Sequence, residues 1–431
     1  MYPSISDLLN DLFGIHIPLP VQTFGFFVAI AFFVSAWVLT LELKRREKMG
    51  WMQGSEEKRW VGKPASSSEL IWNFIIGFLI GFKVVYALLH WDAFSTDPQQ
   101  LLLSGEGNFL GGVVLGAILL VLRYREKQKS RLPEPKEERY TVWPHQRIGD
   151  IVVMAAVGGL VGAKIFDGLE NWKSYMADPI GSFLSFSGLT YYGGLIVAAI
   201  LILWYARKKQ INGWHLVDSA APALMLAYGM GRIGCHMAGD GDWGIYNSAY
   251  INDGHGGVVR AAAGQFRQSL ERFQGYFSLH YGSLDNVPHA SFAKPHFLSF
   301  LPDWFFAFTY HNNVNGDGIP IPGCSGPHCA MLPVPVFPTP LYEIIMCLLL
   351  FAVLWSIRKK IRIPGIIFGI YLIMNGVERF FIELIRVNTK YSIFGIHPTQ
   401  AEIISLLLVI GGALLIVYCR KKHVPLPVSS S

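Results

Sequence analysis

Long apolar stretches alternate with shorter polar segments along the chain. A helix needs about 17–25 apolar residues to cross the hydrocarbon core of a membrane, and most of the stretches reach that length, although the third and fifth are short for a span. The pattern predicts an all-α integral membrane protein with about nine transmembrane helices. The predicted spans are 21–43, 70–90, 108–123, 148–167, 189–206, 214–235, 340–357, 363–386 and 401–419.

Clusters of basic residues follow every second predicted span and begin at Lys44, Arg123, Arg207, Arg358 and Arg420. Basic residues concentrate in cytoplasmic loops, so the N-terminus is expected outside and the C-terminus in the cytoplasm. Hydrophobic residues make up 52% of the chain and charged residues 15%, whereas a soluble domain carries about 25% charged residues. Membrane anchors account for the net charge of +6, which therefore predicts no nucleic-acid partner.

A long polar segment follows the sixth span and falls outside on this topology. Its aromatic content is too high for a disordered linker, so we expect an extracytoplasmic head. That compartment permits a disulfide between Cys324 and Cys329. The predicted divisions are an N-terminal span at 1–45, an inserted first hairpin with cytoplasmic linkers at 46–147, a second hairpin plus the sixth span at 148–245, the head at 246–338 and a three-helix region at 339–431.

The second and third spans resemble the fourth and fifth in sequence. Small residues separated by three positions favour close packing of membrane helices, and they recur here together with a lysine, an Asp-Pro pair and a Gly-Gly pair. The order of these features predicts an internal two-helix repeat with both copies in the same orientation. Gly77, Gly81, Lys83, Asp97-Pro98 and Gly111-Gly112 recur as Gly158, Gly162, Lys164, Asp178-Pro179 and Gly193-Gly194.

The run from Gly231 to Gly244 joins the sixth span to the head and contains Arg232, His236, Asp240 and Asp242. An arginine at the end of a membrane helix is costly unless it pairs or faces water, and the surrounding glycines allow close approach of backbone or ligand. The run predicts an anion-binding site at the membrane surface. One imidazole and two carboxylates in a short turn are too unspecific a pattern to predict a metal.

Charged residues also occur in the last three spans. Asn375, Arg379, Glu383 and Arg386 are spaced to share one face of the eighth helix, and intramembrane charges usually mark function. An Arg379–Glu383 pair that only locks helices together is the alternative. Tyr342-Glu343 and His397–Gln400 begin the seventh and ninth spans at the same outer surface.

These elements resemble those of phosphatidylglycerol–prolipoprotein diacylglyceryl transferases. The resemblance rests on Tyr192–Leu195, the 231–244 run, Leu341–Glu343 and Glu378–Arg386, which occur in the same order as in that family. It covers most of 20–45, 148–245 and 337–419, and leaves out 70–125 and most of 245–336. It implies a cofactor-free enzyme of the bacterial cytoplasmic membrane. Its partners would be phosphatidylglycerol, prolipoprotein signal peptides and membrane lipids.

The resemblance also implies roles for individual residues. Arg232 and Arg379 fall on essential arginines of the family, where guanidinium groups would stabilise a leaving phosphate. Departures from the usual motif include a tyrosine in place of histidine and Cys235 in place of asparagine. The proton acceptor therefore stays open among Tyr192, His236, Asp240 and Glu343. The other expected substrate contacts are Gly193, Gly194, Gly244, Glu343 and Glu383.

Two other functions are compatible with these residues. The arginines would also suit a transporter or lipid-binding protein for an anionic substrate. The departures from the motif would suit an inactive paralogue that binds lipoprotein precursors. An arginine, a histidine and two carboxylates at one membrane face favour an interfacial enzyme over a transport site at the bilayer midplane.

Overall fold

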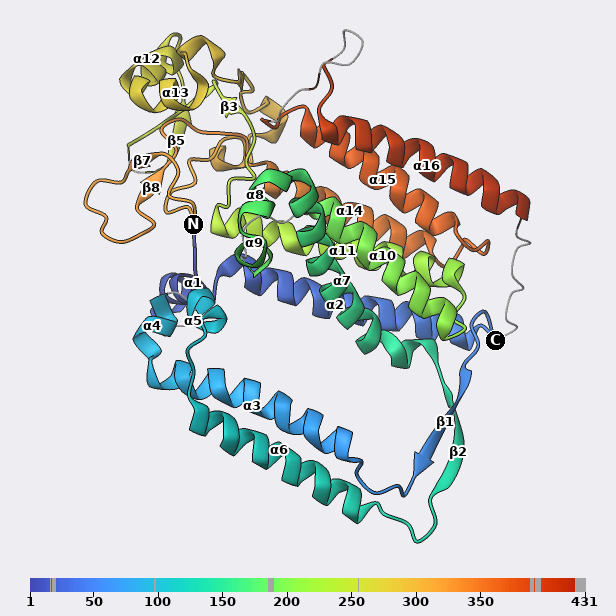
Figure 1. Ribbon diagram of the computed structural model, residues 1–431. Coiled ribbons are helices and arrows are strands. Elements are labelled where there is room, and N and C mark those ends of the chain that lie inside the picture. The colour runs from blue at the N-terminus through green and yellow to red at the C-terminus, as the bar shows by residue number, and fades with distance from the viewer. Residues whose placement is uncertain are drawn as a thin grey trace. The chain divides into compact units, whose positions relative to one another are not determined.

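The computed structural model describes residues 1–15, 17, 21–96, 98–184, 190–254, 256–387, 391 and 397–422. Asp97, which belongs to the predicted repeat, lies outside these residues. The chain divides into two compact units (Figure 1). The first unit contains Met1–Ile17, Val21–Trp51 and the chain from Trp214 onward, and the second contains Met52–Gly213. The second unit therefore holds both predicted hairpins.

Each of the nine predicted spans coincides with one continuous helix. Five of these helices, α2, α3, α7 with the turn before it, α14 and α16, are long and apolar enough to cross a membrane. The chain is therefore a multi-pass, predominantly helical membrane protein. The nine helices are α2 (Thr23–Lys48), α3 (Ser67–Leu89), α6 (Phe109–Lys129), α7 (Ile148–Glu170), α10 (Tyr191–Lys208), α11 (Gly213–Ala238), α14 (Thr339–Ile357), α15 (Ile366–Glu383) and α16 (Gln400–Lys422).

The eighth predicted span ends earlier than its apolar pattern suggests. Helix α15 stops at Glu383, and Arg386 lies beyond it in a short β-bridge with Gly244. The prediction that Arg386 shares a helical face with Arg379 and Glu383 is therefore wrong. Helical periodicity does not predict this break, because the break depends on backbone pairing between Arg386 and Gly244, which is distant in the sequence.

One end of the first unit is held together by buried charges. Glu42 of α2 accepts hydrogen bonds from Arg46 at 3.0 Å and from Arg358, just after α14, at 3.1 Å. Asp218 of α11 accepts from the backbone N–H groups of Gly365 and Phe368, both at 2.9 Å, and so caps the start of α15. The basic ends of α2 and α14 thus meet at the same end of this unit.

Helices α11, α14 and α15 share an apolar core. Ala221, Met225, Cys347, Leu354 and Ile367 are fully buried there. Helix α15 also packs closely on α16, where Gly369 and Gly412 face each other. Small residues permit this approach and the dispersion contacts that hold membrane helices together.

The segment between α11 and α14 folds around its own aromatic core, in which Tyr246, Leu270, Phe277 and Tyr310 are buried. A disulfide joins Cys324 and Cys329. The strands pair over only two or three residues, too few to give a sequence signal. The segment contains β3 (Tyr246–Asn247), β4 (Tyr250–Asn252), β5 (Val258–Arg260), α12 (Gln265–Arg272), α13 (Gln274–Tyr281), β6 (His289–Ala290), β7 (Ile319–Pro320), β8 (Ala330–Met331) and three 3-10 turns (Leu284–Asn286, His296–Leu298, Asp303–Phe305), while α1 (Ile5–Phe13) precedes α2.

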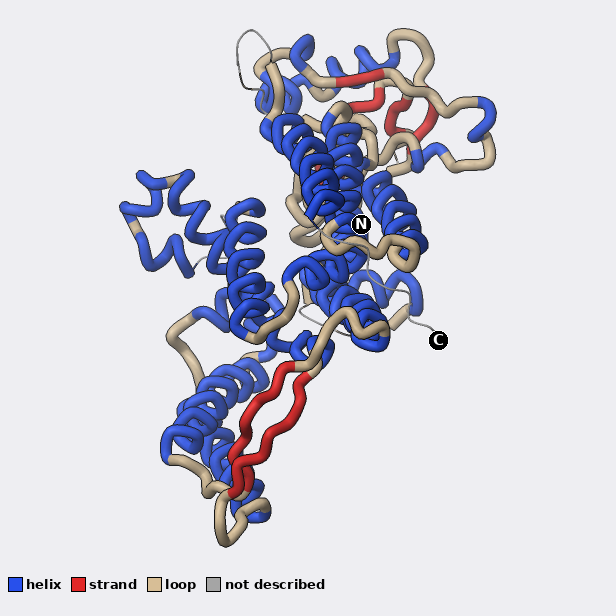
Figure 2. The backbone as a smooth tube through the Cα atoms, turned by 90° about the vertical axis from the view of Figure 1, so that its right-hand side faces the viewer, coloured by secondary structure: helices blue, strands red, loops and turns tan. Residues whose placement is uncertain are grey.

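The second unit is built from an antiparallel ribbon and two helical pairs (Figure 2). The ribbon occupies segments that were expected to be linkers. Its strands are polar on both faces and so lack the apolar alternation that would predict them. The unit contains β1 (Ser55–Val61), α3, α4 (Trp91–Thr96), α5 (Pro98–Leu103), α6, β2 (Lys136–Val142), the turn Pro144–Arg147, α7, α8 (Trp172–Ala177), α9 (Pro179–Leu184) and α10.

The two helical pairs have the same order of elements, a long helix, two short helices and a second long helix. Glycines bring the long helices into contact in both pairs. A Cβ at Gly77 would lie 2.8 Å from the Cα of Gly116, and a Cβ at Gly194 would lie 2.7 Å from the carbonyl oxygen of Gly159. In each pair a lysine of the first long helix donates to backbone carbonyls of the second short helix or of the segment that follows it.

Candidate functional site: arginines over buried glutamates

The site lies where the end of α11 meets the start of α14 and the end of α15, all within the first unit. Gly244 links these elements. Its N–H donates to the carbonyl of Phe337 at 2.9 Å, and the N–H of Ile245 donates to the carbonyl of Ile385 at 2.8 Å. A Cβ at Gly244 would lie 2.9 Å from Cγ2 of Thr339. Only glycine allows this approach, so Gly244 positions the backbone of the site.

Arg232 bridges two carboxylates from different segments. Its Nε lies 3.1 Å from Oε2 of Glu343, and its Nη1 pairs with Oδ2 of Asp242. The guanidinium also lies 5.4 Å from the ring centre of Tyr228, one helical turn earlier. The planar fork of an arginine suits such two-sided pairing.

Glu343 lies at the centre of the site and is fully buried. Its Oε1 accepts a hydrogen bond from the Tyr228 hydroxyl at 2.7 Å and contacts Nη1 of Arg379 at 3.4 Å. Arg379 also pairs with Glu383, with 3.3 Å between Nη2 and Oε2. Both predicted arginines and both predicted glutamates therefore belong to one connected network.

Asp242 joins a third arginine to this network. Its Oδ1 lies 2.5 Å from Nη2 of Arg386, and Thr339 Oγ1 donates to its backbone carbonyl at 2.7 Å. Burial favours a raised pKa for the Asp242 carboxyl, but the charges of Arg232 and Arg386 outweigh burial and hold that pKa below its ordinary value. We call this network the arginine cluster; it comprises Arg232, Arg379, Arg386, Asp242, Glu343 and Glu383.

The two kinds of charge in the arginine cluster differ in exposure. The side chains of Arg232 and Arg379 are 16% and 23% exposed, whereas those of Glu343 and Glu383 are 0% exposed. The glutamates hold the guanidinium groups from the buried side and leave part of each cation accessible. Such fixed, partly accessible guanidinium groups are suited to binding a phosphate.

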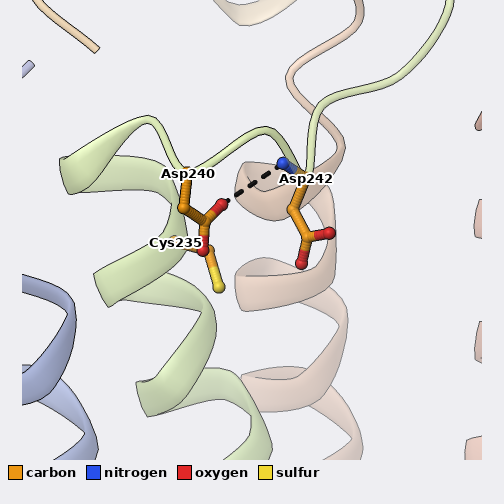
Figure 3. Close-up of side chains that lie close together, drawn as sticks. All are labelled: Cys235, Asp240 and Asp242. Atoms are coloured by element: carbon orange, nitrogen blue, oxygen red, sulfur yellow. Dashed lines mark hydrogen bonds between the residues drawn. The ribbon is translucent and has the colours of Figure 1, made fainter. Parts of the chain in front are cut away.

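Asp240 lies beside this network, near Cys235 and Asp242 (Figure 3). Its Oδ1 accepts from the backbone N–H of Asp242 at 3.2 Å. Burial raises the pKa of the Asp240 carboxyl, and the negative charge of Asp242 adds to this rise. Both oxygens of Asp242 face arginines, and the positive charge of Arg232 opposes a bound cation. The geometry therefore favours an anion over a metal at this position.

His236 points toward the head. Its Nδ1 lies 3.2 Å from the hydroxyl of Tyr310, and its ring packs against Phe308. It also lines a cavity of about 500 Å³ with Trp304 and His311. Within the described residues, its hydrogen-bond partner is Tyr310 and not a member of the arginine cluster.

Tyr192, Gly193 and Gly194 belong to the second unit, at the start of α10. The two glycines pack against the backbone of α7 and allow the two helices to touch. The ring of Tyr192 lies 5.4 Å from that of Tyr191. The contacts of these three residues described here are all within their own unit.

Sequence reasoning named Asp242 only as part of the 231–244 run and Arg386 only as part of the charged face of the eighth span, gave neither an individual role, and did not name Tyr228. The 231–244 run offered two carboxylates, and nothing in it distinguished Asp242 from Asp240. Tyr228 lies four residues before Arg232, and this spacing puts both on one face of α11. That spacing was the available signal for Tyr228.

Comparison with known proteins finds similar sequences that cover about two thirds of this chain. A similar protein from Staphylococcus haemolyticus is 25% identical over 288 residues, which cover 67% of this chain and 78% of the relative. One from Corynebacterium glutamicum is 24% identical over 315 residues, covering 72% and 78%. One from Vibrio cholerae is 26% identical over 288 residues, covering 65% and 78%. All three are named phosphatidylglycerol–prolipoprotein diacylglyceryl transferase.

The sequence model of the prolipoprotein diacylglyceryl transferase family matches residues 134–418. The matched region contains α7, α10 and α11, the head, α14, α15 and most of α16. It thus includes every member of the arginine cluster and leaves out the first helical pair. Because the match extends over more than half of the chain, this protein belongs to the prolipoprotein diacylglyceryl transferase family.

Proposed function

We propose that this protein transfers a diacylglyceryl group from phosphatidylglycerol to the lipobox cysteine of a prolipoprotein. The observation that carries the proposal is the set of partly accessible guanidinium groups held over buried glutamates. The names of the relatives support the same activity. They lend no support to the alternative of a transporter for an anionic substrate.

The proposed reaction is a displacement at carbon. The thiol sulfur forms a bond to the glyceryl carbon that carries the phosphate, the bond from that carbon to oxygen breaks, and glycerol phosphate leaves. Negative charge develops on the leaving phosphate, and we propose that the guanidinium groups of Arg232 and Arg379 stabilise it. The thiol loses its proton to a base, because the thiolate is the reactive form.

The activity is tested with purified protein, phosphatidylglycerol and a lipobox peptide. Mass spectrometry should find one diacylglyceryl group added to the peptide cysteine, and a peptide with serine at that position should remain unmodified. A protein that binds the lipid and the peptide without any mass gain would instead be an inactive member of the family.

Asp240 is our proposed acceptor of the thiol proton. A raised pKa makes a carboxylate a stronger base, and the best catalytic pKa lies near the working pH. Glu343 is less suitable, since Arg232, Arg379 and the Tyr228 hydroxyl already occupy its carboxylate oxygens. His236 donates to or accepts from Tyr310 in the head, so we propose that it helps position the end of α11.

Asp240→Asn and Asp242→Asn should have different kinetic effects. Loss of the proposed base should lower kcat about 100-fold with little change in KM. Loss of Asp242 frees Arg232 and Arg386 from their shared partner and should mainly raise KM for phosphatidylglycerol. In the unmutated protein kcat should fall as the pH drops and Asp240 becomes protonated. A normal kcat in Asp240→Asn would remove it as the base.

Tyr192→Phe should retain appreciable activity. A phenol with a pKa of about 10 is a poor base at neutral pH, so we expect Tyr192 to orient the lipid by hydrogen bonding. Gly193 and Gly194 are proposed to support this contact through the packing of α10. The variant is compared with Asp240→Asn in the same assay. An inactive Tyr192→Phe beside a normal Asp240→Asn would make the tyrosine the proton acceptor.

We also propose that all nine helices cross the bacterial cytoplasmic membrane and that signal peptides of prolipoproteins enter the site from the bilayer. The shared end of the basic clusters after α2 and α14 supports a cytoplasmic location for that end. The matching order of α3 to α6 and α7 to α10 supports an internal repeat. The first pair lies outside the family match, so we propose that it is an inserted copy.

Cysteine labelling tests this topology. His280 of the head and Gln128 at the end of α6 are both exposed, and each is changed to cysteine in turn. A membrane-impermeant reagent should label His280→Cys in intact cells and Gln128→Cys only after the membrane is opened. The reverse pattern would place the head in the cytoplasm.

A further inference from the structure

A buried carboxyl group next to the arginine cluster has no role in the reaction described so far. Glu378 of α15 is 3% exposed. Within the described residues, neither of its carboxylate oxygens accepts a hydrogen bond, and it forms no ion pair. Its neighbour Arg379 is engaged by Glu343 and Glu383. Among the described residues, Glu378 is therefore a buried acid without a hydrogen bond or an ion pair of its own.

The charges of the arginine cluster balance without Glu378. Its three arginines are matched by Asp242, Glu343 and Glu383, each in contact with at least one guanidinium group. An ionised Glu378 would add a fourth negative charge to three positive ones. An unpaired charge inside a membrane helix is costly, so the neutral acid is the favoured form.

The ionisable groups around Glu378 come from all three helices of the site. Three of them are negative or become negative on ionisation, and the hydroxyl of one of these, Tyr228, donates a hydrogen bond to Glu343 at 2.7 Å. None of the cations forms an ion pair with Glu378 among the described residues. These groups are Tyr228 and Arg232 from α11, Glu343 and Cys347 from α14, and Arg379 from α15.

We propose that Glu378 is a protonated acid that allows the arginine cluster to bind an anionic phosphate. This inference rests on the proposed function, in which the phosphate belongs to phosphatidylglycerol. A neutral Glu378 leaves the cluster without net charge, so the arriving anion meets no repulsion from it. Ionisation of Glu378 makes the cluster net negative and opposes the phosphate. The lipid therefore binds to the protein in which Glu378 is protonated, and ionisation of Glu378 weakens its binding.

The test compares the unmutated protein with Glu378→Gln, whose amide has the shape of the neutral acid. As the pH rises from neutral into the alkaline range, the KM for phosphatidylglycerol of the unmutated protein should rise about tenfold, as expected for one added buried like charge. The KM of Glu378→Gln should stay flat. Glu271→Gln, an exposed head residue, serves as the matched control and should follow the unmutated protein. Equal pH profiles for Glu378→Gln and the unmutated protein would overturn the proposal.

Infrared spectroscopy separates this inference from the proposed transferase activity. A protonated carboxylic acid has a carbonyl band of its own, and the unmutated protein at neutral pH should show one that disappears in Glu378→Gln. This measurement needs no turnover. Absence of transfer together with the band would refute the function but keep the neutral acid, whereas absence of the band would refute the neutral acid.

Discussion

Replacing Arg232 with lysine is expected to abolish transfer or reduce it by at least about 100-fold, the loss typical for one transition-state donor. Arg232 reaches Glu343 through Nε and Asp242 through Nη1. A single ammonium group keeps the charge but cannot hold both carboxylates in one plane. The rate of mass gain on a lipobox peptide, measured with saturating phosphatidylglycerol, gives the size of the loss.

Arg267→Lys is the matched control for this substitution. Arg267 is 51% exposed and pairs with Glu271 and Asp285 on the head surface, where such pairs contribute little. Its lysine variant should transfer normally. Circular dichroism should show unchanged helix content for both variants. Near-normal turnover in Arg232→Lys would remove Arg232 from the phosphate site.

Replacing Glu343 with glutamine is expected to destabilise the first unit by about 3–5 kcal/mol, the cost of removing one partner from a buried ion pair. Glu343 is fully buried and contacts Arg232, Arg379 and the Tyr228 hydroxyl. The amide would leave two guanidinium groups without their shared counter-charge. Thermal unfolding in detergent should show the loss, and transfer should fall with it because both arginines lose their support.

The control for this change is Glu271→Gln, whose carboxylate is 57% exposed. Its stability should change by no more than about 0.5 kcal/mol. Equal unfolding temperatures for Glu343→Gln and Glu271→Gln would contradict the role of Glu343 as the shared counter-charge of Arg232 and Arg379. In that case Arg232 and Arg379 would have to be held by Asp242 and Glu383 instead.

The helices could be predicted because a membrane helix carries its own signal. An apolar run of sufficient length has no other stable state in a lipid environment, since its backbone must satisfy its hydrogen bonds internally. Runs such as 340–357 and 401–419 therefore correspond to α14 and α16 within a few residues. The short strands carry no comparable signal, because each depends on a partner elsewhere in the chain.

The members of the site were only partly predictable. Arg232, Arg379, Glu343 and Glu383 stand out in sequence because charges are rare in apolar helices, and the structure joins them in one network. The sequence could not rank Asp240 against Asp242. The turn after α11 decides which carboxylate faces the arginines, and turn geometry depends on contacts with Phe337 and Ile385.

By itself, the sequence determined the helical class, the family and the chemical character of the site, because these follow from composition, spacing and residue type. Only the tertiary structure decided which charges are paired. It brought Arg386 to Asp242 from beyond the end of α15 and directed His236 toward Tyr310. It also buried Glu378 without a hydrogen-bond partner among the residues that the structure describes. The physical reason is that pairing and burial are properties of segments brought together in space, and a linear pattern records only the segments.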